Sequence, residues 1–306
     1  MKIFLYVLSA IGLLAWAVCF ALGYNYMEGG ALSLSILLGV ALLAVTGLLF
    51  YLMGRWSHPS AEDHKASAKT WEILSLAGYL VVVGVSAYGV AQFITVQTTV
   101  QNEVRPMAEQ RLDELDRVFG NADIPGSYLS YVEDKSTTFG VNVGGKYTGL
   151  DENGKQENID LAIASFVGEV TGDGQFYNLQ KEVAGEGGFI AHCRYSIAYW
   201  WPWTVTTYLS KLDTDLPKWE DEVMKMSTGH EWTVNEPYTV ESVASGSLIE
   251  KIKDPAGGVF SGFAILIIFV IQAIILISYL SGRNWNTDGP RQFKNGQFAT
   301  WDGNRR

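Results

Sequence analysis

Cysteine is scarce in this chain, which has only Cys19 and Cys193 among its 306 residues. Cys19 lies within a long apolar run, so Cys193 has no partner for an intramolecular disulfide in the polar part of the chain. A domain stapled by disulfides is thereby excluded. We expect Cys193 to be a buried free thiol, with a disulfide to another chain as the alternative.

Signatures of enzyme chemistry are also missing from the sequence. It contains no Gly-x-Ser-x-Gly nucleophile motif, no phosphate-binding Gly-x-x-x-x-Gly-Lys-Ser/Thr loop and no dinucleotide fingerprint. His230 precedes Glu231, which would suit an acid and base pair, but no nucleophile motif accompanies them. The sequence therefore predicts a non-enzymatic protein that uses no cofactor.

Established metal-binding spacings are absent as well. Three short segments combine imidazole, thiol or carboxylate groups: residues 58–64, His192 with Cys193, and residues 151–157. The first matches no metal motif, the second would point its two side chains to opposite faces of a strand, and the third lacks the terminal Glu of a calcium loop. We expect no bound metal, and we interpret these groups as solvated turns, a capped helix end and a core or surface pair.

Long apolar runs, by contrast, are abundant. Four of them contain no Asp, Glu, Lys or Arg in their interior: residues 3–23, 31–53, 73–96 and 259–280. A bilayer core about 30 Å thick needs roughly 20 apolar residues at a rise of about 1.5 Å each, and every run meets that length. The sequence therefore predicts an integral membrane protein with four transmembrane α-helices, the last of them within residues 258–281.

Acidic residues gather in one part of the chain. Residues 98–257 hold 26 of the 32 Asp and Glu but only 13 of the 22 Lys and Arg. Basic residues of short loops prefer the cytoplasmic side, and here they occur in residues 54–72 and 282–306. We therefore expect both termini to be cytoplasmic and residues 98–257 to be extracytoplasmic, in a plasma or inner membrane. The acidic charge excludes nucleic acid as a natural ligand.

Small residues recur at helical spacing in two of the predicted spans. Such stripes let helix backbones approach closely, which is the main way of packing helices in lipid. The residues expected to pack in this way are Ala31, Ser35, Gly39, Ala87 and Ala91. Packing within one chain is the main interpretation, and contact between copies is the alternative. Gln272, midway along the fourth span, is expected to form an interhelical hydrogen bond.

Residues 98–257 are expected to form one domain inserted between the third and fourth helices. Apolar residues with a period near 3.5 predict a helical stem over residues 98–120 that continues the third span. Beyond it, short stretches rich in Tyr, Phe, Thr and Val are separated by glycine turns, and the turns at 151–154 and 172–174 are typical of β-hairpins. These patterns predict an α+β domain, with a further helix near residues 216–226.

Tryptophan is concentrated in one short segment. Residues 189–209 are about as long as a membrane span, but Arg194 within them would be costly at the bilayer centre, so we interpret them as a buried strand or an interfacial surface. Trp is enriched at protein interfaces and at membrane surfaces, which makes three residues here candidates for partner contact or headgroup docking, with a domain core as the alternative. They are Trp200, Trp201 and Trp203. Four aromatic residues of the basic tail are further candidates for partner binding: Trp285, Phe293, Phe298 and Trp301.

The layout of the spans is similar in topology to that of the tetraspanins, which also combine four spans with a short first outer loop and a long second one. The cysteine-rich signature of their long loop has no counterpart here, because Cys193 is the only cysteine outside the apolar runs. The resemblance therefore extends to topology alone and implies no function.

These features together predict a non-enzymatic membrane subunit that acts as a scaffold or accessory component of a larger assembly. Its expected partners are other membrane proteins, including copies of itself, and the lipid bilayer. One alternative is a transmembrane sensor that relays ligand binding in the outer domain to a separate cytoplasmic effector. The other is an oligomeric channel or transporter subunit, although the predicted spans contain no carboxylate or histidine that would carry protons.

Overall fold

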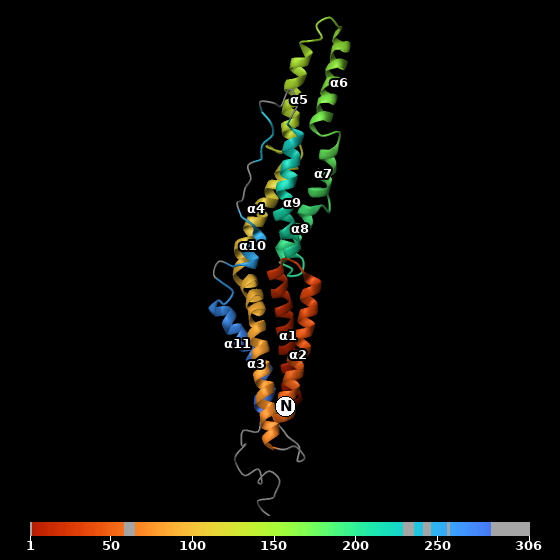
Figure 1. Ribbon diagram of the computed structural model, residues 1–306. Coiled ribbons are helices and arrows are strands. Elements are labelled where there is room, and N and C mark those ends of the chain that lie inside the picture. The colour runs from red at the N-terminus through yellow and green to blue at the C-terminus, as the bar shows by residue number, and fades with distance from the viewer. Residues whose placement is uncertain (1, 58–64, 229–235, 241–245, 256–257, 283–306) are drawn as a thin grey trace, which may run out of the picture. The chain divides into compact units, whose positions relative to one another are not determined.

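A computed structural model describes residues 2–57, 65–228, 236–240, 246–255 and 258–282 of the chain. Figure 1 shows its elements in chain order, from α1 in red to α11 in blue. The chain divides into two compact units, each described below by itself. We call residues 1–24, 32–95 and 259–306 the apolar unit, and residues 25–31 and 96–258 the acidic unit.

Four long helices account for the described part of the apolar unit. They are α1 (Lys2–Glu28), α2 (Leu32–Ser57), α3 (Lys65–Thr95) and α11 (Gly262–Gly282). Each is long and apolar enough to cross a membrane, so the four predicted transmembrane helices are confirmed by their length and composition. The helical conformation runs on from α3 without a break as far as Val118.

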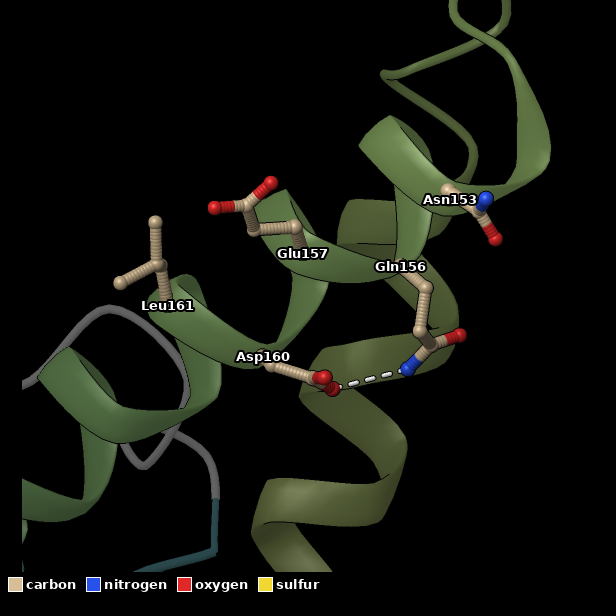
Figure 2. Close-up of a pocket in the computed structure, with 5 residues that line it drawn as sticks. All are labelled: Asn153, Gln156, Glu157, Asp160 and Leu161. Carbon is tan, nitrogen blue, oxygen red and sulfur yellow. Dashed lines mark hydrogen bonds between the residues drawn. The ribbon is translucent and has the colours of Figure 1, made fainter.

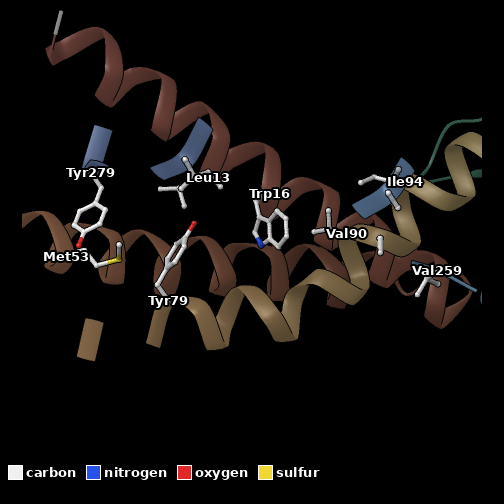
Figure 3. Packing of buried hydrophobic residues seen from close by; sticks show 11 residues of the cluster. Leu13, Trp16, Met53, Tyr79, Val90, Ile94, Val259 and Tyr279 are labelled. Atoms are coloured by element: carbon white, nitrogen blue, oxygen red, sulfur yellow. The ribbon is translucent and has the colours of Figure 1, made fainter. Parts of the chain in front are cut away.

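Apolar and aromatic side chains fill the centre of the apolar unit. Leu13, Trp16, Tyr79, Val90 and Ile94 are all buried there, and Figure 3 shows their side chains between the helices. Large apolar side chains also cover the outside, as at Val85 and Phe269, which are 76% and 68% exposed. Exposed apolar surface on this scale is typical of helices that are surrounded by lipid.

Glycine permits the closest helix approach in the apolar unit. A Cβ added at Gly23 of α1 would collide with the carbonyl oxygen of Gly89 in α3. A Cβ at Gly39 of α2 would lie 2.8 Å from the Cβ of Ala21 in α1. Only glycine therefore fits at these two crossings without displacing a neighbour.

Buried polar side chains link the helices of the apolar unit in pairs. The Tyr79 hydroxyl donates to Oε1 of Gln272 at 2.8 Å, joining α3 to α11. Nε1 of Trp16 donates to Oγ of Ser86 at 2.9 Å, joining α1 to α3. Because no water is present in a bilayer core to satisfy such groups, these partners must come from neighbouring helices.

The described part of the acidic unit contains eight helical elements, besides residues 25–31, which hold the end of α1 and the turn before α2. They are a π-helical turn η1 (Val96–Val100), α4 (Gln101–Val118), α5 (Tyr128–Gly144), α6 (Glu152–Val170), α7 (Gln175–Val183), α8 (Phe189–Tyr199), α9 (Val205–Met226) and α10 (Leu248–Lys253). Helix α4 packs against α8, α9 and α10. The region predicted as a helical stem, residues 98–120, thus contains the end of η1 and all of α4.

The predicted α+β architecture of this unit is wrong. The described part of the chain is 81% helix and contains no strands. The two segments predicted as hairpin turns lie between helices or at the start of a helix. The Asp151 carboxylate accepts from the backbone N–H of Gly154 and caps the start of α6. Gly172 and Gly174, which have φ angles of 59° and 94°, separate α6 from α7 rather than two strands.

Segment 189–209 is likewise not a strand. It forms α8, a turn and the start of α9. Its buried residues Ile190, Cys193 and Ile197 recur every three or four positions, which is the period of a helix with one buried face. The abundance of aromatic and β-branched residues was therefore a weaker signal than this spacing.

One buried carboxylate ties three helices of the acidic unit together. Oδ1 of Asp213 in α9 accepts from Nη1 of Arg111 in α4 at 2.6 Å and from the backbone N–H of Leu248 in α10 at 3.0 Å. Its Oδ2 accepts from Oγ of Ser247 at 2.7 Å and from the backbone N–H of Ile249 at 2.8 Å. The side chains of Arg111 and Asp213 are only 8% and 9% exposed, so this ion pair is removed from water.

Candidate interaction surface

Helix α8 presents one uncharged face to solvent. Residues Ala191, Tyr195, Ala198 and Tyr199 are exposed and follow the spacing i, i+4, i+7, i+8, which places them on one side of the helix. The Tyr195 and Tyr199 side chains are 60% and 64% exposed, and their ring centroids lie 4.7 Å apart. We call these four residues the α8 face.

The turn after α8 carries a second exposed aromatic pair. Trp200 ends the helix in the left-handed conformation, with φ of 48°, and is itself buried. Trp201 and Trp203 are 39% and 43% exposed, and their rings are stacked with centroids 5.5 Å apart. We call residues 200–204 the Trp turn.

Hydrogen bonds hold the Trp turn against the last turn of α1. Nδ2 of Asn25 donates to the carbonyl oxygen of Pro202 at 3.0 Å and to Oγ1 of Thr206 at 3.3 Å. Oγ of Ser196 lies 2.9 Å from Oγ1 of Thr204, which fixes the other side of the turn. The backbone that carries the two exposed tryptophans is therefore held in place by hydrogen bonds on both sides.

No charged residue occurs in the sequence from Tyr195 to Ser210, although the unit around it is strongly acidic. The cation nearest in the sequence, Arg194, binds three carboxylates of α4, those of Glu109, Asp113 and Asp116, so its charge is compensated at the edge of the α8 face. A second cation, Arg105 of α4, donates from Nη2 to the carbonyl oxygen of Ala198 at 3.2 Å. An apolar, uncharged and partly aromatic area of this kind is typical of contact surfaces.

The Cys193 thiol lies behind this surface and takes no part in it. Its side chain is fully buried. Burial raises the pKa of this thiol to about 12, and the negative charge of Glu109 acts in the same direction. A thiol of such high pKa is neutral and unreactive near pH 7.

The tryptophans predicted as contact residues thus divide into two kinds. Trp200 is 3% exposed and belongs to the interior, whereas Trp201 and Trp203 lie at the surface. Tyr195 was not predicted, although its spacing of four residues from Tyr199 would have identified the pair once the segment was taken as helical. The remaining four candidates, Trp285, Phe293, Phe298 and Trp301, lie outside the described residues.

The residues predicted for helix packing lie mostly inside the apolar unit. Ser35 and Gly39 are buried on α2, and Ala91 is fully buried on α3 with Ala87 packed against the same cluster. Gln272 forms its hydrogen bond to Tyr79. Ala31 differs, because it belongs to the turn before α2 and is half-buried.

One buried carboxylate of the apolar unit was not predicted from the sequence. Glu72 is only 6% exposed, and its Oε1 accepts from the Tyr279 hydroxyl at 2.6 Å. The third span was predicted to begin one residue later, so this side chain was placed outside it. The helix in fact begins at Lys65 and carries Glu72 into the packed interior.

The described residues contain no group of three or more His, Cys, Asp and Glu side chains that could hold a metal ion. His192 stacks on Tyr208 with ring centroids 6.4 Å apart. The other two imidazole-containing candidates, residues 58–64 and His230 with Glu231, lie outside the described residues.

A shallow hollow on α6 includes part of the former calcium candidate. Figure 2 shows its lining side chains, Asn153, Gln156, Glu157, Asp160 and Leu161, all on this one helix. Nε2 of Gln156 donates to Oδ1 of Asp160 at 2.8 Å. The side chains therefore line an exposed face of a single helix.

The chain matches no protein-family model, no curated protein and no solved structure. The α8 face and the Trp turn are therefore characterised by their own chemistry, which is that of a contact surface.

Proposed function

We propose that this chain is a non-enzymatic integral membrane subunit that acts as a scaffold or accessory component of a larger membrane assembly. The α8 face is the observation that carries the proposal. Tyr195 and Tyr199 leave most of their rings in solvent, beside Ala191 and Ala198, which allow a partner to approach the helix closely. Aromatic side chains of this kind supply large contact areas at a small entropic cost.

The proposed orientation places both termini in the cytoplasm and the acidic unit outside the cell membrane, in a plasma or inner membrane. The distribution of Lys and Arg supports it, because residues 54–72 and the tail hold eight Lys and Arg between them, whereas residues 98–257 hold twice as many Asp and Glu as Lys and Arg. In this arrangement the α8 face meets the extracytoplasmic part of another subunit, and the aromatic tail contacts a partner inside. Further copies of the same chain are included among the proposed partners.

Site-specific cross-linking tests the proposal on the full chain in its native membrane. A photoreactive phenylalanine at position 195 should cross-link to one defined protein, and the double variant Tyr195→Asp/Tyr199→Asp should lose that subunit in native mass spectrometry. The matched control is position 177, because Tyr177 is 47% exposed on α7 and lies outside the α8 face. A monodisperse monomer without any cross-link at 195 would contradict the proposal.

A transmembrane sensor is the second candidate, and one observation favours it. An uninterrupted helix from Ser67 to Val118 belongs partly to the apolar unit and partly to the acidic unit. It contains the π-helical turn η1, and turns of this type are frequent at functional sites. A shift of this helix would relay binding to a separate cytoplasmic effector.

Cationic probes test the sensor, since an acidic surface attracts cations. We expect Ca²⁺, Mg²⁺ or spermine to raise the thermal unfolding temperature of the full chain and to change hydrogen exchange at Val96–Val100 if the chain is a sensor of such ligands. Absence of both effects with all three probes would favour the structural subunit.

A further inference from the structure

The turn between α1 and α2 marks the level of the bilayer surface. Helix α1 ends at Glu28 and α2 begins at Leu32, so three residues separate two helices that are each long and apolar enough to span a membrane. A connection this short leaves no room for either chain end to move away from the lipid. Residues 25–31 therefore lie at or just beyond the headgroups, whichever side of the membrane they face.

The Trp turn is fixed directly to the last turn of α1 and to the connection that follows it. Asn25 is fully buried and donates hydrogen bonds to Pro202 and Thr206, at 3.0 and 3.3 Å. The neighbouring Gly30 lies against the hydroxyls of Thr206 and Thr207. Because residues 25–31 and the Trp turn belong to the same compact unit, these contacts hold the turn at the level of the headgroups.

The side chains of the Trp turn suit that level. Trp201 and Trp203 are stacked and leave 39% and 43% of their surface exposed, and Tyr199 lies beside them in sequence with 64% exposed. Trp and Tyr favour the membrane interface, where an apolar ring meets lipid and its N–H or O–H meets water. The Lys253 side chain lies against Gly29 of the same connection, which adds a cation at the level of the lipid phosphates.

From these observations we infer that the Trp turn docks into the headgroup layer of the bilayer, with Trp201 and Trp203 as its anchors. The contact restrains the acidic unit at a third point, besides the connections through η1 and α10. The inferred docking requires that the four apolar helices cross a bilayer, and it does not depend on a protein partner. The α8 face remains available for such a partner, because Tyr195 lies one helical turn further from the Trp turn than Tyr199 does.

A spin label at position 203 tests the inference in the full chain. The label is attached to Trp203→Cys in a background with Cys19→Ala and Cys193→Ala, and the protein is reconstituted into phosphatidylcholine vesicles that contain a nickel-chelating lipid. We expect relaxation by the headgroup-bound nickel to exceed relaxation by a water-soluble nickel complex. The matched control is a label on Tyr177→Cys, an exposed aromatic position on α7, where relaxation by the water-soluble nickel complex should exceed relaxation by the headgroup-bound nickel.

Two results would overturn the inference. A label at 203 that relaxes like the one at 177 would place the turn in water, and a label shielded from both relaxation agents would show that protein covers it. Native tryptophan fluorescence provides a second measurement that needs no cysteine. Shallow brominated lipids should quench the wild type more strongly than the variant Trp201→Phe/Trp203→Phe, and equal quenching would again contradict lipid docking.

Discussion

The two units of this chain are both helical, yet they distribute polar and apolar groups in opposite ways. In the apolar unit the exposed side chains are apolar, as at Val85 and Phe269, and buried polar groups such as Ser86 are paired between helices. In the acidic unit the interior is apolar, as at Leu112 and Val223, which are both fully buried. The contrast indicates that the solvent around each unit, lipid or water, selects which groups face outward.

The units also differ in what brings their helices together. Glycine and alanine set the distances in the apolar unit, where the Gly23 and Gly89 backbones touch. In the acidic unit large rings fill the core, and the Phe176 ring lies 4.8 Å from Tyr128 and 5.8 Å from Phe119. Burial of large apolar side chains drives packing in water, whereas close backbone contact replaces it in lipid.

The largest predicted effect concerns the buried ion pair of the acidic unit. Asp213→Ala leaves Arg111 without its carboxylate and removes the acceptor of two backbone N–H groups of α10. We expect a loss of about 3–5 kcal/mol in the free energy of unfolding. Urea titration of the full chain in mild detergent, followed by circular dichroism, measures it.

Asp215→Ala is the matched control on the same helix. Its carboxylate binds Lys218, whose side chain is 66% exposed. Such a surface pair contributes about 0–1 kcal/mol, so the control should unfold close to the wild type. Equal losses of unfolding free energy for the two variants would show that the contacts of Asp213 with α4 and α10 do not stabilise the acidic unit.

The next effect concerns glycine packing in the apolar unit. Gly23→Ala places a methyl group onto the carbonyl oxygen of Gly89, and because backbone rather than a flexible side chain must move, we expect a loss of about 3 kcal/mol. Gly84→Ala on α3 meets nothing within 4 Å and should change stability by less than about 0.5 kcal/mol. Unfolding in SDS from mild detergent distinguishes them, and a neutral Gly23→Ala would refute the close crossing of α1 and α3.

Removing a hydrogen bond between two helices of the apolar unit is expected to change the free energy of unfolding by a smaller amount. Tyr79→Phe removes the donor to Gln272 Oε1 and should cost about 0.6 kcal/mol, which is typical of such bonds in membranes. Tyr88→Phe, at a position 43% exposed on the same helix, is the control and should have no effect. A double-mutant cycle with Gln272→Leu isolates the coupling between the two side chains, and zero coupling would exclude the bond.

The smallest effect is a dependence on pH. Burial of Glu220 raises the pKa of its carboxyl, and the nearby charge of Glu114 raises it further while Arg111 lowers it. The folded chain therefore binds this proton more tightly than the unfolded chain, so its contribution to stability is present at low pH and is lost as the pH rises through the folded pKa. Glu220→Gln should gain stability relative to wild type as the pH rises from 4 to 7, as urea titrations at both values would measure. A pH-independent difference would contradict the raised pKa.

The apolar unit was the predictable part of the fold, because the length of an uncharged run is set by the bilayer and needs no knowledge of tertiary contacts. The helix boundaries in this unit were predicted less accurately. The third span was predicted to begin at residue 73, which left Glu72 in a loop, but α3 begins at Lys65 and Glu72 is buried. Charge near a span end is a poor signal of exposure when a neighbouring helix supplies a partner such as Tyr279.

The acidic unit was predicted less well because its local signals are ambiguous. Tyr, Phe, Thr and Val favour strands, and glycine turns connect helices as readily as strands. The buried positions Phe176, Leu179 and Val183 follow helical spacing, which the strand prediction overlooked. At the contact surface, the sequence indicated the tryptophans as a group, but only the left-handed conformation of Trp200 decides that it turns inward while its neighbours remain exposed.

The proposal that the two units lie in different solvents, with the acidic unit outside, is tested most directly by labelling single cysteines on intact cells. Tyr177→Cys reports on α7 and Lys69→Cys on the start of α3, both at exposed positions and both in the background without native cysteines. A membrane-impermeant maleimide should label position 177 from outside, and position 69 only after the membrane is permeabilised. Labelling of position 69 from outside, or protection of position 177, would contradict the proposed orientation and the roles assigned to the acidic unit.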